Sequence, residues 1–342
     1  MTSDMKLGVG YNLWDCEELL WRSVESIRAQ AHFVVIVYQR VSNFGMPCSP
    51  HLRALLAAMQ KRGLVDRVIH LDVPSAWPES KRRELTAVDA KSSECGGDLM
   101  QVQPQFFTET FKRELGRAAA EKAGCTHFMS MDADEFYLAD QLAAAKQYVV
   151  ARRLVATACR MRLYFKLPTC ELRPLDDVSA VPFIVELGAN RHFRLAVPSE
   201  LMLDPTRKVS NTGPIELLPR ELVEMHHMTF VRRDVRSKLT NVSNRSNYRT
   251  DVDAFVAQFE RWQPGDAVIH PHPVIGRLFT STAPIPNYFG VDLFEVCAAC
   301  STPVDLQRCA GCRWTRYCCV EHQTDHWPAH REQCLQWQLQ QQ

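Results

Sequence analysis

The sequence predicts an α/β protein with a doubly wound mixed sheet, followed by a small metal-stabilised module. Short apolar, β-branched runs alternate with stretches of helical periodicity through the first half of the chain, which is the order typical of right-handed βαβ units. Seven of the 13 cysteines lie between residues 297 and 334, in a segment too short to form a hydrophobic core of its own.

The expected elements follow from the spacing of apolar residues. Residues 33–38 are almost wholly apolar and β-branched, which is typical of a central parallel strand. Residues 74–105 are polar, include Gly96 and Gly97 and lack a clear period, so we expect a long loop. The other predicted strands are 7–13, 65–71, 128–131, 160–166 and 182–187, and the predicted helices are 17–29, 50–61, 108–123 and 138–148.

The most informative stretch is THFMSMDADEFY, residues 126–137. Its acids Asp132, Asp134 and Glu135 directly follow a buried strand, and α/β sheets bind their ligands at the carboxyl ends of strands. Asp132 and Asp134 are two residues apart, so both can reach one hard divalent cation whose remaining positions are filled by phosphate oxygens. The simpler alternative is a solvated turn that begins the following helix.

Other candidate ligands lie at predicted strand ends or on nearby helices. Adjacent residues on a strand face opposite ways, so only one of His226 and His227 can point at the two aspartates. We select His227 as a third metal ligand, the alternative being a hydrogen-bonded core histidine. The candidates for contact with a nucleotide or its phosphates are Tyr11, Asn12, Tyr38, Arg117 and Lys238. Ordinary loop polarity and a solvated helix face are the competing interpretations.

Composition excludes several functions. The net charge is +1 and no basic stripe is present, so nucleic-acid binding is not expected. No run approaches the roughly 20 apolar residues that span a bilayer, and the first residues lack the features of a signal peptide. We therefore expect a cytosolic or nuclear protein that is not secreted, with its scattered cysteines as free thiols.

The C-terminal cysteines and histidines follow the spacing C-x2-C-x8-C-x2-C-x5-C-x3-H-x7-H-x3-C from Cys297 to Cys334. Eight soft or borderline ligands in pairs are enough for two tetrahedral zinc sites. The sequence therefore predicts two structural Zn²⁺ ions.

Four stretches give the first part of the chain a resemblance to GT-A glycosyltransferases of the family-2-like group. They are GVGYNLWDCEELLWRSVESI at 8–27, VVIVYQRVSNFG at 34–45, ETFKRELGRAAAEKAGCTHFMSMDADEFY at 109–137 and MHHMTFVRRDVRSKL at 225–239. The Asp-x-Asp of residues 132–134 resembles the DxD signature of these enzymes. The resemblance covers about residues 6–273 and concerns order and spacing more than one diagnostic string.

This resemblance implies a metal-dependent transfer of a sugar from a nucleotide-sugar donor to an unidentified acceptor. Mn²⁺ or Mg²⁺ held by Asp132, Asp134 and His227 would stabilise the departing nucleoside diphosphate. Glu135 and Glu224 are the candidates for a general base. One alternative is an inactive GT-A-like scaffold that acts through protein binding, and another is nucleotidyl or phosphoryl transfer on the same sheet.

The C-terminal segment resembles the MYND finger, including RYC before the fifth ligand and HWPAHREQC at the end. The interleaved pairing of that family implies two ligand sets, Cys297, Cys300, Cys318 and His322 for one zinc and Cys309, Cys312, His330 and Cys334 for the other. His322 departs from the usual cysteine but remains an acceptable zinc ligand. MYND fingers bind proteins, often through short proline-containing peptides, so a protein partner is expected. No Asn-His-x-Cys string accompanies it, which argues against a lysine methyltransferase.

The resulting division of the chain has four parts. Residues 1–285 are the expected transferase-like domain, 286–295 a linker, 296–335 the zinc finger and 336–342 a polar tail.

Overall fold

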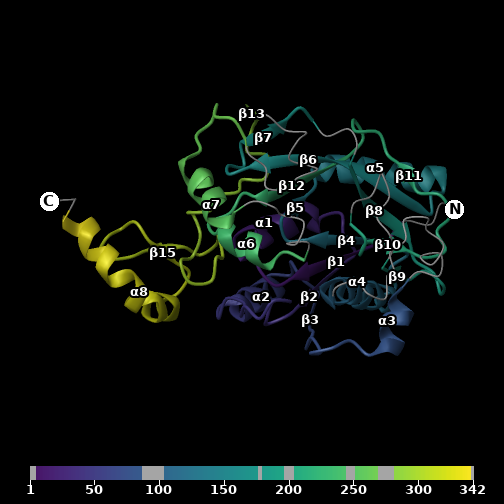
Figure 1. Ribbon diagram of the computed structural model, residues 1–342, viewed down its shortest axis with the longest axis horizontal. Coiled ribbons are helices and arrows are strands. Elements are labelled where there is room, and N and C mark those ends of the chain that lie inside the picture. Colours follow the sequence, from purple (N-terminus) through teal and green to yellow (C-terminus); the bar gives the residue numbers. More distant parts are fainter. Residues whose placement is uncertain are drawn as a thin grey trace.

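The computed structural model describes residues 5–86, 104–175, 179–195, 204–243, 251–268 and 281–339. Its centre is a mixed sheet with the main strand order β13-β7-β6-β8-β4-β1-β2-β3 (Figure 1). The parallel part consists of β3 (Arg67–His70), β2 (Phe33–Tyr38), β1 (Leu7–Leu13) and β4 (His127–Asp132). Every residue of β1 is buried, as expected for a central strand covered on both faces. The predicted α/β class with a mixed sheet is confirmed.

The second part of the sheet is mostly antiparallel. β4 pairs with β8 (Ala180–Glu186), and β8 pairs with the first half of β6 (Ala156–Phe165). The second half of β6 lies beside β12 (Glu224–Phe230), and β12 pairs with the two-residue strand β5 (Glu135–Phe136). The remaining strands of this sheet are β7 (Cys170–Arg173), β11 (Glu216–Leu217) and β13 (Ser281–Pro284).

Helices cover both faces of the parallel part. α1 (Glu17–Arg28), α2 (Leu52–Lys61) and α5 (Ala139–Arg152) share one apolar core on the first face. α4 (Pro104–Lys122) covers the other face and packs closely on β1. A Cβ atom on Gly8 would lie 2.5 Å from the Cβ atom of Ala120, so this approach requires glycine in β1.

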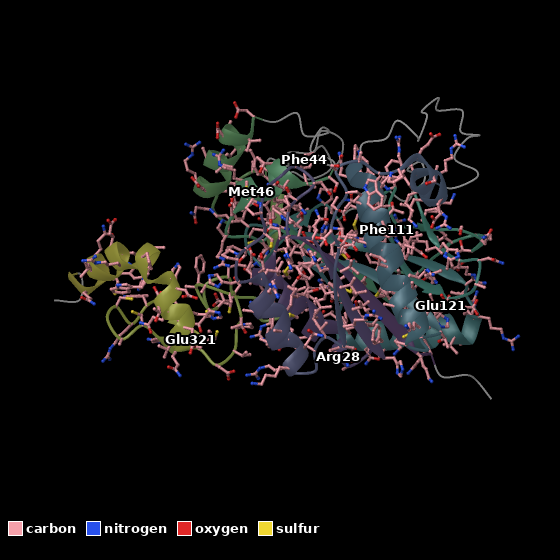
Figure 2. All side chains as sticks on the ribbon, turned by 90° about the horizontal axis from the view of Figure 1, so that it is seen from below. Arg28, Phe44, Met46, Phe111, Glu121 and Glu321 are labelled. Carbon is pink, nitrogen blue, oxygen red and sulfur yellow. The ribbon has the colours of Figure 1, made fainter. Side chains whose placement is uncertain are left out.

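Two helices close the carboxyl end of the sheet. α6 (Val235–Asn241) begins at Asp234, whose side chain accepts a hydrogen bond from the Ser237 backbone N–H. α7 (Val252–Arg261) packs an aromatic cluster against β6 and β12. In Figure 2 the loop after β2, with Phe44 and Met46, lies on the side of the molecule where these helices lie. A hydrogen bond of 2.8 Å between the Ser42 hydroxyl and Asn241 joins that loop to α6.

The predicted long loop at 74–105 is only partly correct. Residues 79–85 form a short helix, α3 (Glu79–Leu85), whose Leu85 packs with Phe107 of α4. α4 begins at Pro104, earlier than predicted, while residues 87–103 lie outside the described part of the chain. Near α3 lie the two strands of a small separate sheet, β9 (Phe193–Arg194) and β10 (Lys208–Val209).

The C-terminal module projects from one end of the molecule, where Glu321 is labelled in Figure 2. It contains β14 (Gln307–Arg308), β15 (Arg316–Tyr317) and α8 (Val320–Leu339). Its buried cluster consists mostly of cysteines, because so short a segment has few apolar side chains to bury. α8 includes the first residues of the predicted polar tail, and residues 340–342 lie outside the described part.

The segment predicted as a linker packs on the main domain. Val291 is 2% exposed, Leu293 is 8% exposed, and both belong to the core beneath α1 and α2. The ring of Phe289 lies 4.9 Å from that of Phe136, directly after the acidic turn. Within the described ranges, no helix is both long enough and apolar enough to cross a membrane.

Candidate functional site

The acidic turn lies at the carboxyl end of β4, where β5 and β12 meet the parallel part of the sheet. Asp132 is the last residue of β4 and the register partner of Asn12 in β1. His227 of β12 is the register partner of Glu135, and the Met228 N–H donates to the Asp134 carbonyl at 2.8 Å. The structure therefore brings together Asn12, Asp132, Asp134 and His227 from strands far apart in sequence.

Asp134 is 3% exposed and surrounded by cationic side chains. Its Oδ2 atom accepts from Arg232 at 2.9 Å and from Lys238 at 3.3 Å, and its Oδ1 atom lies 3.7 Å from His227 Nε2. Burial alone would raise the pKa of Asp134, but the charge of Lys238, together with His227 and Arg232, lowers that pKa well below its usual range. Asp134 is therefore a carboxylate at neutral pH.

Asp132 is more accessible, with a side chain 35% exposed. Arg207 donates to its Oδ2 atom at 2.8 Å and Arg113 to Oδ1 at 3.3 Å. Burial opposes ionisation, but Arg113 and Arg207 lower the pKa of Asp132 to about 2. Like Asp134, it is ionised and partly neutralised by arginine.

Glu135 has a different environment. It is 2% exposed, accepts both Arg207 Nη2 at 2.5 Å and the Asp132 N–H at 3.1 Å, and its pKa is raised by burial. A general base must reach the acceptor hydroxyl. Glu135 instead lies beneath the turn, where it forms a buried ion pair with Arg207.

Only some of the predicted metal ligands at this turn are spaced for one divalent cation. Two ligands of one ion with bonds of about 2.1 Å are separated by roughly 3 to 4 Å, which matches the 3.7 Å between Asp134 Oδ1 and His227 Nε2. Among the described residues, however, Asp132 does not join these two in a cluster with all ligand atoms within 4.8 Å. Of the three predicted ligands, Asp134 and His227 are therefore the pair close enough to share one cation.

An open groove lies at the carboxyl ends of β2 and β3. It is lined by the loop Gln39–Asn43, by residues 70–75 after β3, by Trp77 and by the start of α4. A groove at this edge of a parallel sheet is where α/β folds bind nucleotides.

A chain of polar contacts connects the groove to the turn. Asn43 donates to Glu109 Oε1 at 3.2 Å, and Asn12 donates to Glu109 Oε2 at 3.3 Å. Lys112 lies 3.1 Å from the same carboxylate. Because Asn12 is the register partner of Asp132, this chain of contacts runs from the groove to the strand end that carries the acidic turn.

The structure does not bring every predicted residue to the site. Tyr11 is fully buried and its hydroxyl bonds Ser23 of α1 at 3.2 Å, while Tyr38 is 6% exposed and packs against the ring of His70. Arg117 pairs with Glu114 and Glu121 along α4, both at 2.9 Å. Glu224 is held by Arg162 and Arg220 and faces away from His227, since the two residues are three apart on one strand.

Three arginines hold the turn: Arg113, Arg207 and Arg232. The sequence offered Lys112, Arg113 and Arg117 as alternatives for one phosphate contact and the basic pair of DPTRK, residues 207 and 208, for substrate contact or plain surface, whereas Arg232 was not predicted. Arg113 lies one helical turn before Arg117, the residue selected from the same helix. The prediction therefore had the right helix, but the arginine at the turn is Arg113. Arg207 comes from the stretch DPTRK, whose last residue, Lys208, begins β10, and Arg232 comes from the RRD directly before α6. In both stretches, two adjacent basic residues in a polar segment were the feature of the sequence that could have indicated these arginines.

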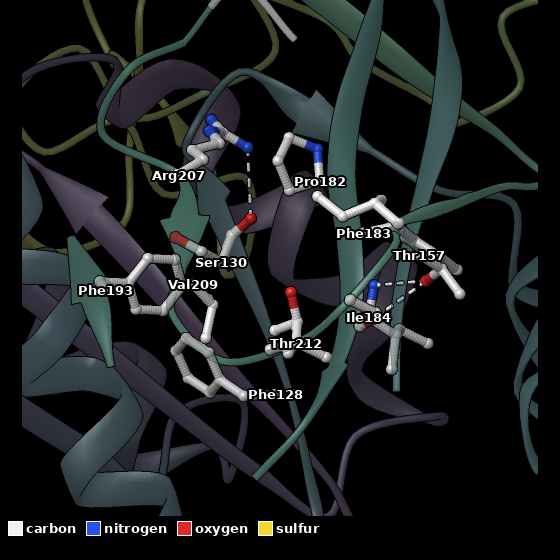
Figure 3. Close-up of a pocket in the computed structure, with 13 residues that line it drawn as sticks. Phe128, Ser130, Thr157, Pro182, Phe183, Ile184, Phe193, Arg207, Val209 and Thr212 are labelled. Atoms are coloured by element: carbon white, nitrogen blue, oxygen red, sulfur yellow. Dashed lines mark hydrogen bonds between the residues drawn. The ribbon is translucent and has the colours of Figure 1, made fainter. Parts of the chain in front are cut away.

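A second cavity beside Arg207 is apolar (Figure 3). Phe128, Phe193, Val209 and Ile184 are among its lining residues, and Arg207 donates to the Ser130 carbonyl at its edge at 3.3 Å. Arg207 is the sole titratable residue of the described lining and is already paired with Glu135. This cavity offers no catalytic group.

The C-terminal module contains two tetrads of metal ligands. In the first, Cys318 Sγ lies 3.0 Å from His322 Nδ1 and 3.6 Å from Cys300 Sγ, with Cys297 completing the set. Tetrahedral zinc with bonds of about 2.3 Å places its sulfur ligands roughly 3.8 Å apart, so these spacings fit zinc.

The second tetrad is more deeply buried. Cys312 Sγ lies 3.4 Å from His330 Nε2, and Cys309 Sγ lies 3.9 Å from Cys334 Sγ. Both sets are those that the interleaved pairing implied. They define the module as a two-zinc finger.

The comparison with family models agrees with the geometry of the finger. Residues 297–334 match the family model of the MYND finger. No curated protein matches the chain.

Solved structures similar to the chain are GT-A glycosyltransferases. TarS of S. aureus is 15% identical with a TM-score of 0.37, and the match covers 75% of this chain and 43% of that one. TarS 1–349 in complex with UDP-GlcNAc is 13% identical with a TM-score of 0.36, covering 75% and 72%. GalNAc-T7 with UDP, GalNAc and Mn²⁺ is 11% identical with a TM-score of 0.38, covering 76% and 52%. The chain thus spans less than half of full TarS and about half of GalNAc-T7.

Proposed function

We propose that the protein is a glycosyltransferase that uses a nucleotide-sugar donor and carries a MYND finger for a protein partner. The observation that supports this most is the groove at the ends of β2 and β3, which hydrogen bonds through Asn43, Glu109 and Asn12 connect to the strand beside Asp132. A nucleoside in this groove would point its diphosphate at the acidic turn.

The residues at the turn have distinct roles in this proposal. Asp132, Asp134 and His227 would hold Mn²⁺ or Mg²⁺, which supplies stabilisation of the charge that develops on the departing diphosphate. Lys238, 3.3 Å from Asp134, donates to a phosphate oxygen when donor binds. Arg113 and Arg207 keep Asp132 ionised, and a cation that binds Asp132 would compete with both arginines for its oxygens. The acceptor, the sugar and the general base stay unassigned.

A reducing compartment suits the finger and the free thiols in this proposal. Zinc thiolates and the free cysteines of the described chain persist where glutathione keeps thiols reduced. A short, proline-containing peptide is the partner expected for the finger.

Calorimetric titration of the zinc-loaded protein with nucleoside diphosphates, with and without Mn²⁺, tests the transferase site. We expect one nucleotide to bind in a Mn²⁺-dependent way and expect Asp132→Asn and Asp134→Asn to abolish that dependence. Asp140→Asn, in the first turn of α5 and exposed, is the matched control and should bind as the wild type does. Turnover is then measured as release of the nucleoside diphosphate from the corresponding nucleotide sugar.

A second candidate function is a protein-binding scaffold without transferase activity. The observation that favours it is that both aspartates already have cationic partners, Arg113 and Arg207 for Asp132 and Arg232 and Lys238 for Asp134. Absence of binding by every nucleotide, together with zinc-dependent binding of a peptide, would select the scaffold.

A further inference from the structure

The first zinc tetrad of the finger contacts the loop that supports the acidic turn. We call residues 297–302, between and just after the ligands Cys297 and Cys300, the knuckle. Ser301 Oγ in the knuckle accepts a hydrogen bond from Arg233 Nη2 at 2.5 Å. Ser301 has a left-handed φ of 60° and its N–H donates to the Cys297 carbonyl at 2.8 Å, so its position follows from the turn that presents the zinc ligands.

Arg233 is adjacent to Arg232, and the main domain holds both. Arg232 spans two carboxylates, with 2.9 Å from Nη2 to Asp134 Oδ2 and 3.1 Å from Nη1 to Asp15 Oδ2. The Arg233 N–H donates to Glu18 Oε1 at 3.4 Å. Carboxylate oxygens of Asp15, Glu17 and Glu18 lie within 4.8 Å of one another, so this pair of arginines also neutralises an acidic cluster.

Further contacts fix the finger against the same side of the domain. Val304 packs on the main apolar core, and Asp305 forms an ion pair with Arg62 of the turn after α2. The ring of His322, a ligand of the first tetrad, lies 5.4 Å from that of His51 in an edge arrangement. With the packed segment around Val291, these contacts make the first tetrad part of a continuous interface.

We propose that the knuckle positions the acidic turn of the transferase domain, so that zinc in the first tetrad and the geometry of Asp134 are coupled. Zinc fixes Ser301, Ser301 holds Arg233, and the adjacent Arg232 holds Asp134. Ser301 and Arg233 are positioning residues. A protein partner that binds the finger and displaces the knuckle would release Arg232 from Asp134. Binding of the partner would then change the geometry of the acidic turn. The coupling is inferred from these contacts. Only its effect on donor binding rests on the proposed function.

Variants of Ser301 test this coupling in the full, zinc-loaded chain. Ser301→Gly removes the hydroxyl but suits the left-handed φ, so the knuckle keeps its shape. Ser301→Asn also tolerates that φ and restores an acceptor for Arg233. The readout is hydrogen exchange at the amides of Val231 and Arg233, which donate to the Met228 carbonyl and to Glu18. We expect exchange about threefold to tenfold faster in Ser301→Gly and near wild-type exchange in Ser301→Asn, from the net strength of one typical hydrogen bond.

Two further measurements make the result decisive. Removal of zinc from the wild-type chain should accelerate exchange at the same two amides, and normal protection without zinc overturns the proposal. Thr315→Val is the matched control, because Thr315 contacts His330 of the second tetrad at 3.3 Å. It should leave the amides of Val231 and Arg233 unchanged. Unchanged exchange in Ser301→Gly with zinc retained also overturns the coupling.

The same variants separate this proposal from the proposed function. If a nucleotide binds with Mn²⁺, Ser301→Gly should weaken that binding about threefold to tenfold and Ser301→Asn should recover it. Failure of all nucleotides to bind would count against the transferase alone, because the exchange measurements need no donor.

Discussion

Arg207 binds Asp132 and Glu135 with the same nitrogen, Nη2, at 2.8 Å from Asp132 Oδ2 and 2.5 Å from Glu135 Oε1. This arginine is 3% exposed and also reaches Asp204 at 3.0 Å. One guanidinium thus compensates the accessible first aspartate of the turn and the buried glutamate beneath it. The turn can hold three acids in four residues because a distant loop supplies this charge.

Replacement of Arg207 should therefore destabilise the fold. Arg207→Met leaves Glu135 buried without its ion-pair partner, and breaking a buried pair costs about 3–5 kcal/mol. Urea denaturation measures the loss, and adding Glu135→Gln to this variant should recover a large part of it. Arg22→Met, which breaks a more exposed pair with Glu25, is the control and should change stability by less than about 1 kcal/mol. A similarly small effect for Arg207→Met would contradict this account.

The finger should bind two zinc ions per chain, one in each tetrad. Native mass spectrometry should show two in the wild type and one in His322→Ala, because His322 is a ligand of the first tetrad. Cys319→Ser is the matched control, since Cys319 belongs to neither tetrad, and it should retain both ions. Loss of an ion from Cys319→Ser, or retention of both in His322→Ala, would mean that the ligand set is wrong.

Glu17 should make stability fall as pH rises. Its Oε1 atom is buried without a hydrogen-bond partner, and burial, reinforced by Asp15, raises the pKa of Glu17 from 4.5 to about 7. The folded state keeps this proton at pH values where the unfolded chain has lost it, so the contribution of Glu17 to stability falls between about pH 4.5 and 7. Glu17→Gln should be more stable than the wild type at pH 8, by up to about 3 kcal/mol, and the difference should vanish near pH 4.

Thermal or urea denaturation at several pH values checks this effect. Glu221→Gln, at an exposed position, controls for the loss of one surface charge and should show no such pH dependence. A difference between Glu17→Gln and the wild type that is the same at pH 4 and pH 8 would show that Glu17 does not titrate in this range.

The parallel half of the sheet was predictable because it depends on local pattern. Short apolar runs predicted β1, β2 and β4, and the acids that end β4 predicted an acidic turn at the sheet edge. The zinc ligands were predictable for a similar reason, since their spacing is fixed by short loops. The helix α3 was missed because its seven residues, ESKRREL, carry too few apolar side chains to show a period.

Side-chain direction and partners from distant loops were not predictable. β1 is buried on both faces, so its sequence does not tell which way Tyr11 points, and its hydroxyl in fact bonds Ser23. Arg207 lies 75 residues after Asp132 and Arg232 lies 98 residues after Asp134, and contacts at such separations depend on the whole topology. The placement of His227 beside the turn required the register of β12 with β5.

Lys238 should have opposite effects on Mn²⁺ binding with and without a nucleotide. Its ammonium lies 3.3 Å from Asp134 Oδ2, where it competes with a metal ion in the free protein. Lys238→Met should therefore bind Mn²⁺ alone about tenfold more tightly, from the loss of one nearby positive charge. With a nucleoside diphosphate present, the variant should bind Mn²⁺ about tenfold more weakly than the wild type, because a phosphate oxygen loses a charged donor. Calorimetric titration with Mn²⁺, with and without the nucleotide, checks both effects. Lys122→Met, at an exposed position at the end of α4, is the control. Equal Mn²⁺ affinity in the variant and the wild type would show that the ammonium and the metal do not share Asp134.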